Sequence, residues 1–77
     1  DHDCEIQDGV HIAPGSHLAG EISIGFETFV GIGAKIIPNV RIGSNVIIGA
    51  GSTVIESISD NKKVVGTPAH PIKKTKR

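Results

Sequence analysis

Aliphatic residues recur at every sixth position along most of this chain. The series runs without a gap through Ile6, Ile12, Leu18, Ile24, Val30, Ile36, Ile42, Ile48 and Val54. A second column of small or β-branched residues follows each of them by four positions, and Cys4 belongs to that column as well. A six-residue period fits neither an α-helix nor a strand with simple two-residue alternation. The pattern instead predicts short strands that turn a corner once in every hexapeptide.

Three hexapeptides, about 18 residues, close one triangular turn, and successive turns stack at about 4.8 Å, the usual strand spacing. The corners need residues that accept a positive φ, and Gly or Asn recurs there, at Gly9, Gly15, Gly33, Asn39, Asn45 and Gly51. The nine hexapeptides therefore predict an all-β fold, a parallel β-helix of about three turns.

The period ends after Val54. Residues 56–63 are polar and are expected to form a loop, followed by a short apolar strand and a turn. Prolines in this last part disfavour a helix. We therefore expect a β-helix domain over residues 1–58 and a loop with a basic C-terminal tail over residues 59–77.

Stacking the chain at eighteen residues per turn sorts the candidate side chains into columns. The expected outward columns are Pro14, Ile32 and Ala50; His11, Phe29 and Ile47; and His17, Lys35 and Thr53. One inner corner is expected to hold Cys4, Ile22, Val40 and Ile58, so the Cys4 thiol is expected to pack rather than react. Exposed Phe29 and Ile47 give so short a coil a reason to associate with further copies.

Composition argues against several classes of function. The formal net charge is zero, which argues against a general nucleic-acid binder. The basic residues gathered after position 72 are expected to be a solvated end, with a patch for an anionic ligand as the alternative. A single cysteine favours a reducing compartment, here the cytoplasm. No apolar run is long enough to cross a bilayer, and no signal peptide is visible.

The histidines do not predict a metal site. His11 and His17 are six residues apart, in equivalent positions on successive faces, so their side chains should point in different directions. No zinc or other metal is therefore expected. Binding to a regular surface such as ice is also disfavoured, because the outward columns are mixed rather than ladders of threonine.

The chain resembles one particular family of hexapeptide proteins. The motif His2-Asp3-Cys4, His11 nine residues after His2, the repeats, and Val65-Gly66-Thr67-Pro68-Ala69 together are similar to the sialic acid O-acetyltransferase family. This family includes the UDP-4-amino-sugar N-acetyltransferases of bacterial glycan synthesis. The resemblance covers nearly the whole chain and implies that the β-helix is left-handed.

The resemblance implies an acetyl-CoA-dependent transferase that works as a homotrimer, with its active sites between subunits. It implies that His2 is the general base, that Asp3 raises the basicity of His2, and that His11 contacts acetyl-CoA near the thioester. It also assigns cofactor contacts to Ile32 and Ala50. The acceptor would be an amine or hydroxyl of a sugar or nucleotide sugar.

These residue types suit acetyl transfer. The acceptor must lose a proton as it attacks the thioester, and histidine with its ordinary pKa of about 6.5 is a neutral base at cellular pH. A carboxylate beside it stabilises the imidazolium that forms. The tetrahedral oxyanion needs a donor, which His11 or a backbone N–H would supply.

The chain departs from the family in one respect. Family members carry an N-terminal Rossmann-like domain that holds the nucleotide sugar, and no Gly-rich strand–loop–helix signature is visible in this chain. The alternative interpretation is therefore a truncated, non-catalytic β-helix trimer that only binds CoA or mediates assembly. Within the enzymes, transferases acting on serine or simple sugars are the second choice.

Overall fold

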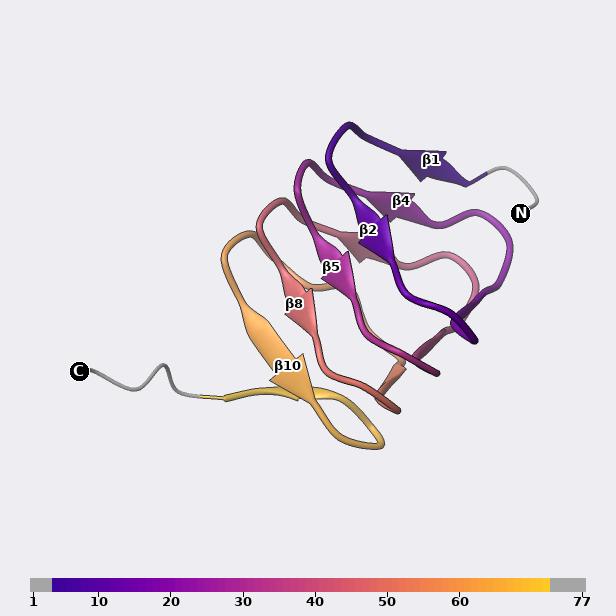
Figure 1. Ribbon diagram of the computed structural model, residues 1–77, viewed down its shortest axis with the longest axis vertical. Coiled ribbons are helices and arrows are strands. Elements are labelled where there is room, and N and C mark those ends of the chain that lie inside the picture. The colour runs from indigo at the N-terminus through magenta and orange to yellow at the C-terminus, as the bar shows by residue number, and fades with distance from the viewer. Residues whose placement is uncertain (1–3, 73–77) are drawn as a thin grey trace.

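The computed structural model describes residues 4–72, and in this range the chain winds into a coil of very short parallel strands (Figure 1). Sheet A contains β1 (Glu5–Ile6), β4 (Ser23–Ile24) and β7 (Arg41–Ile42). Sheet B contains β2 (His11–Ile12), β5 (Phe29–Val30), β8 (Ile47–Ile48), β10 (Lys63–Val65) and β11 (His70–Pro71). Sheet C contains β3 (His17–Leu18), β6 (Lys35–Ile36) and β9 (Thr53–Val54).

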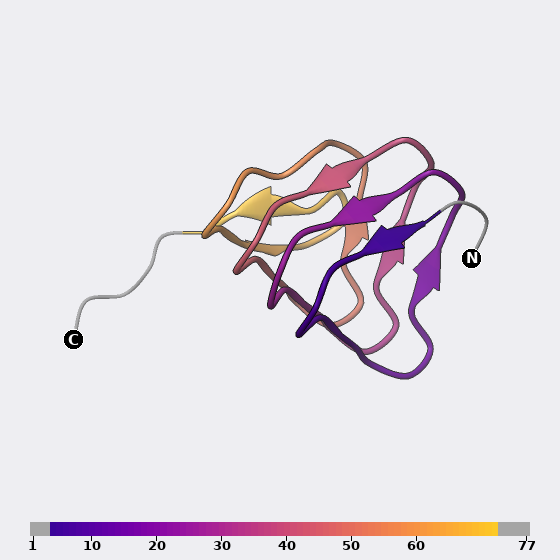
Figure 2. The same ribbon diagram turned by 90° about the horizontal axis from the view of Figure 1, so that it is seen from above.

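The coil has the repeat length that the hexapeptides predict. Partners from β1 to β9 are eighteen residues apart, for example Glu5 with Ser23 and Phe29 with Ile47. Each of the three sheets receives one strand per turn, and successive turns lie one behind another along the coil axis (Figure 2). The expected all-β fold, a parallel β-helix of about three turns, is confirmed.

Positive φ angles mark the same corner in successive turns. Between sheets A and B this position is taken by Gly9, Glu27, Asn45 and Asn61, with φ from 56° to 78°. Gly15, Gly33 and Gly51 take it between sheets B and C, with φ from 71° to 77°. Because the left-handed region is cheapest for Gly and then Asn, these residues let the chain turn with little strain. Glu27 and Glu21 adopt it without that advantage.

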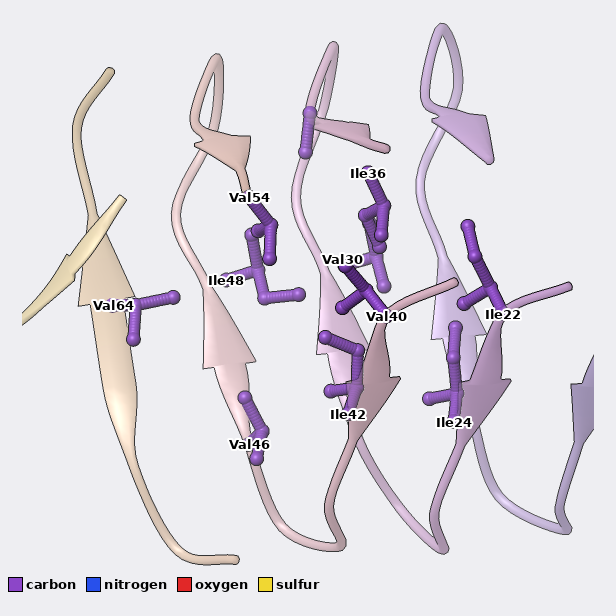
Figure 3. Close-up of a cluster of buried hydrophobic side chains, with 11 residues drawn as sticks. Ile22, Ile24, Val30, Ile36, Val40, Ile42, Val46, Ile48, Val54 and Val64 are labelled. Atoms are coloured by element: carbon purple, nitrogen blue, oxygen red, sulfur yellow. The ribbon is translucent and has the colours of Figure 1, made fainter. Parts of the chain in front are cut away.

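The core lies inside the coil and is built from one aliphatic side chain per strand. Figure 3 shows Val30, Ile48 and Val64 on neighbouring strands of sheet B, facing the side chains of the other two sheets. All three are at most 2% exposed. Burying an Ile or Val side chain stabilises the fold by roughly 1.5–3 kcal/mol, so this narrow column supplies most of the driving force.

The first turn is less well covered. Ile6 is 44% exposed and Ile12 is 37% exposed, whereas their partners Ile24 and Val30 are fully buried. The cause is geometric, because within residues 4–72 the strands β1, β2 and β3 have a neighbouring strand on one side alone.

The last turn is two residues shorter than the others. Ile58 bridges Ile42 and Lys63 pairs with Ile47, so both offsets are sixteen rather than eighteen. The expectation that Ile58 stacks on Val40 is therefore wrong. The chain reaches sheet A early because Ile58 follows Val54 by four residues, where earlier turns use six.

Parallel pairing continues beyond residue 58, where we expected the β-helix domain to end. The segment expected to be a loop contains the Ile58 bridge and the first residue of β10. Strand β10 extends sheet B, and β11 turns back to pair with it antiparallel, through Val64 with Pro71 and Val65 with His70.

Candidate functional site

His11 begins strand β2, and its imidazole faces outward from sheet B. It is in register with Phe29, which is in turn in register with Ile47, as expected from the eighteen-residue spacing. The His11 and Phe29 rings are stacked, with centroids 5.0 Å apart and planes inclined by 6°. Phe29 is 41% exposed and Ile47 is 44% exposed, so the column forms an open surface.

Ile32 and Ala50 lie one above the other on the corner between sheets B and C. The N–H of Gly51 donates to the carbonyl of Ile32 at 2.8 Å, and the N–H of Gly33 donates to that of Pro14 at 3.2 Å. These bonds join equivalent corners of successive turns, which confirms the expected column. Ile32 is 63% exposed, and Ala50 is exposed as well.

The structure therefore brings three of the five expected site residues to one side of the coil. The corner at Ile32 follows Phe29 by three residues. The Ile32 column therefore lies just beyond the C-terminal ends of the sheet B strands, next to the outward face that carries the His11 column. The remaining two, His2 and Asp3, lie outside the described residues.

The other histidines and the cysteine lie elsewhere. His17 is exposed on sheet C and is in register with Lys35, as expected. His70 is exposed, with Nδ1 3.4 Å from the carbonyl oxygen of Pro68. The Cys4 thiol packs against the core and donates to the carbonyl of Ala19 at 3.5 Å, which confirms an inward role.

Two further features bear on function. Over residues 4–72, no three His, Cys, Asp or Glu side chains come close enough to one another to hold a metal ion. The same part of the chain also contains no helix with the length and apolar character needed to cross a membrane.

Two hollows of the surface lie away from the expected site. One, of about 530 Å³, opens on sheet A and is lined by Arg41, Ile58 and Asp60 among others. A smaller one, of about 130 Å³, lies at the C-terminal end of the coil beside Val54 and Val64. His11, Ile32 and Ala50 line neither of these two hollows and are exposed on the outside of the coil.

Comparison with known proteins shows which proteins the chain resembles. Residues 21–56 match the family described as bacterial transferase hexapeptide (six repeats). With the register described above, the chain is a left-handed hexapeptide-repeat β-helix that matches those of acyltransferases, as the resemblance implied.

The solved structures that the chain resembles include sugar acetyltransferases. A mutant of GDP-perosamine N-acetyltransferase from Caulobacter crescentus, in complex with CoA and GDP-perosamine, matches 94% of this chain at 39% identity and a TM-score of 0.92. The acetyltransferase domain of PglB from Neisseria gonorrhoeae, in complex with acetyl coenzyme A, matches 94% of it at 43% identity and a TM-score of 0.92. A maltose O-acetyltransferase from Clostridium difficile matches 99% of it at 32% identity and a TM-score of 0.86.

The matched part of these proteins is a fraction of their length. The chain spans 34% of the perosamine enzyme, 35% of the PglB domain and 55% of the maltose enzyme. The expected resemblance to sugar acetyltransferases is confirmed for this β-helix.

Proposed function

We propose that this chain is the β-helix of an acetyltransferase that moves an acetyl group from acetyl-CoA to an amine or hydroxyl of a sugar or nucleotide sugar. Two matches over 94% of the chain carry the proposal, one to a perosamine N-acetyltransferase in complex with CoA and one to an acetyltransferase domain in complex with acetyl coenzyme A. The match to a maltose O-acetyltransferase supports keeping a hydroxyl acceptor beside the amine. Acetyl-CoA is a co-substrate in this proposal, and no metal takes part.

The donor binds along the outward columns of sheet B and its corner. Ile32 and Ala50 are one turn apart, about 4.8 Å, so a pantetheine arm parallel to the coil axis contacts them in succession. Both side chains are apolar and exposed, which suits contact with a flexible thioether and amide chain. His11 contacts the acetyl end, where an N–H of its imidazole donates to the thioester oxygen as negative charge develops.

His2 acts as the general base in this proposal. The acceptor nitrogen or oxygen bonds to the acetyl carbon while His2 takes its proton, and the carbon–sulfur bond then breaks. The thiolate of CoA leaves and is protonated, so no covalent enzyme intermediate is needed. Asp3 stabilises the imidazolium formed on His2.

A second copy of the chain completes the site. The donor residues are exposed on the outside of the coil, and exposed Phe29, Ile32 and Ile47 provide apolar area for association. We propose a homotrimer with one site at each subunit junction, located in the cytoplasm. Its acceptor is held in part by protein outside this β-helix.

Acetyl transfer is tested by following free CoA thiol as amino sugars and nucleotide amino sugars are added to protein and acetyl-CoA. His2→Ala is expected to lower kcat by about 10²- to 10⁴-fold, which is the range for loss of a general base. His17→Ala is the matched control, because this histidine is exposed on sheet C. Equal activity of His2→Ala and the wild-type protein would exclude His2 as the base.

A further inference from the structure

The stacked pair formed by His11 and Phe29 lies on the exposed surface of sheet B. The two residues are parallel-strand partners, so their side chains leave neighbouring strands in the same direction. The strand spacing of about 4.8 Å brings their rings face to face, with centroids 5.0 Å apart. A near-parallel stack with an inclination of 6° leaves the nitrogen atoms at the edge of the imidazole uncovered.

Functional histidines usually have their ring orientation set by a hydrogen bond from the second nitrogen to a carbonyl or carboxylate. His11 has no such partner among residues 4–72, where neither a hydrogen bond nor an ion pair to its ring is found. The contact with the Phe29 ring therefore takes the place of that hydrogen bond.

The fold itself does not require an aromatic residue at position 29. Its neighbour Val30 supplies the buried side chain of β5, whereas the Phe29 ring is 41% exposed. The next residue in the column, Ile47, occupies the same position without a ring. A leucine at position 29 would preserve apolar contact with Ile47 but would remove the flat surface on which the imidazole lies.

We propose that Phe29 is a positioning residue that holds the His11 imidazole in the orientation needed at the acetyl thioester. This inference rests on the proposed role of His11 in acetyl-CoA binding. Phe29 touches the imidazole with its face, so the ring edge remains free to donate to the thioester oxygen. Loss of the stack leaves His11 present but distributed over several rotamers.

The test combines kinetics with NMR of the histidine ring protons in the wild-type protein, Phe29→Leu and Phe29→Tyr. Phe29→Leu is expected to lower kcat by about threefold to tenfold, which is the factor that the interaction free energy of an aromatic pair corresponds to. The KM for acetyl-CoA should change little. The His11 ring protons lose their upfield ring-current shift in the same variant. Phe29→Tyr, which keeps the ring, is expected to retain both the shift and the rate.

Phe26→Leu is the matched control. Phe26 is also exposed, at 52%, but lies on a corner between sheets A and B rather than on a strand beside His11. It should alter neither the His11 resonances nor kcat. Unchanged unfolding of Phe29→Leu in urea excludes a general loss of structure.

The outcomes separate this inference from the function on which it rests. If wild-type protein transfers acetyl groups and Phe29→Leu loses the ring-current shift but keeps its kcat, the positioning role is wrong. An unchanged His11 spectrum in Phe29→Leu overturns the stack itself. If wild-type protein transfers no acetyl group to any acceptor, the proposed function fails and the role of Phe29 fails with it, whatever the spectrum.

Discussion

Two glycines in one corner serve this fold for different reasons. Gly31 is buried, and a Cβ placed on it would lie 2.7 Å from the backbone nitrogen of Ala50 and 2.7 Å from the carbonyl oxygen of Ile48. Gly33 faces open space, with nothing within 4 Å of such a Cβ, but has a φ of 71°. The first glycine allows the close approach of two turns, and the second allows the corner.

Replacing these glycines by alanine should therefore have unequal effects. Gly31→Ala forces two turns apart and is expected to cost more than about 2 kcal/mol, as overpacking does. Gly33→Ala carries only the strain of the left-handed region, about 1 kcal/mol. Urea unfolding followed by circular dichroism at one fixed protein concentration measures both. Equal losses would show that backbone approach at Gly31 does not limit the fold.

Glu27 offers a stabilising substitution. It has a φ of 57° at a corner where the neighbouring turns use Gly9 and Asn45. Glu27→Asn is expected to raise the free energy of unfolding by about 0.5–1 kcal/mol, because Asn tolerates the left-handed region better than Glu. The same measurement on Glu56→Asn provides the control, since Glu56 is exposed but does not have a positive φ. A similar gain in both variants would remove the conformational explanation.

At the scale of the element, strands of two residues are too short to specify their own pairing. Buried hydroxyl groups near the corners add hydrogen bonds between successive turns. Thr28 is 1% exposed, and its Oγ1 donates to the carbonyl of Gly43 at 2.7 Å and accepts from the N–H of Val46 at 3.1 Å. One side chain thus joins the second turn to the third at two points.

Thr28→Val tests this link with almost no change in shape. It removes both hydrogen bonds and leaves buried backbone groups without partners, so a loss of about 1–3 kcal/mol is expected. Thr53→Val should cost less than about 0.5 kcal/mol, because Thr53 is half-buried and, within residues 4–72, its hydroxyl meets only that of Thr67, at 3.4 Å. Thermal or urea unfolding compares the two. A Thr28→Val protein as stable as wild type would contradict the link.

The strands were predictable because the period is strict and each turn repeats it. The register of the last turn was not predictable. Ile58 fits the column of small or β-branched residues that follows each aliphatic by four positions, and it fits the aliphatic position beside Ile42 equally well. Hydrophobicity alone does not distinguish these registers. At the site, the eighteen-residue spacing predicts which residues share a column. It does not predict the stacking of His11 on Phe29, because the rotamers depend on side-chain torsions that the period does not specify.

At the scale of the whole molecule, a narrow coil leaves much apolar surface outside. Large hydrophobic side chains at least 37% exposed are Ile6, Ile12, Phe26, Phe29, Ile32, Ile37, Ile47 and Ile55. A small domain with a core one residue wide gains stability by covering such surface with further copies. The exposure of His11, Ile32 and Ala50 on the outside of the coil is compatible with the same arrangement, in which a neighbouring copy would supply the second wall of a site.

Association predicts that stability depends on protein concentration. If a trimer unfolds to three separate chains, each tenfold rise in concentration adds about 2.7 kcal/mol per trimer. The urea midpoint should therefore rise when unfolding is repeated at higher concentration. Ile32→Lys, which places a charge on the most exposed of these side chains, should weaken this dependence. A midpoint independent of concentration would mean that the chain folds as a monomer.

The central claim is that this β-helix presents an acetyl-CoA site, and titration calorimetry of acetyl-CoA into protein of measured mass tests it most directly. The predicted result is a trimer that binds about one acetyl-CoA per chain, because a cyclic trimer has as many junctions as subunits. His11→Ala should weaken that binding, while His17→Ala should leave it unchanged. A trimer with no measurable affinity for acetyl-CoA would contradict the account and identify the chain as a coil that serves assembly alone.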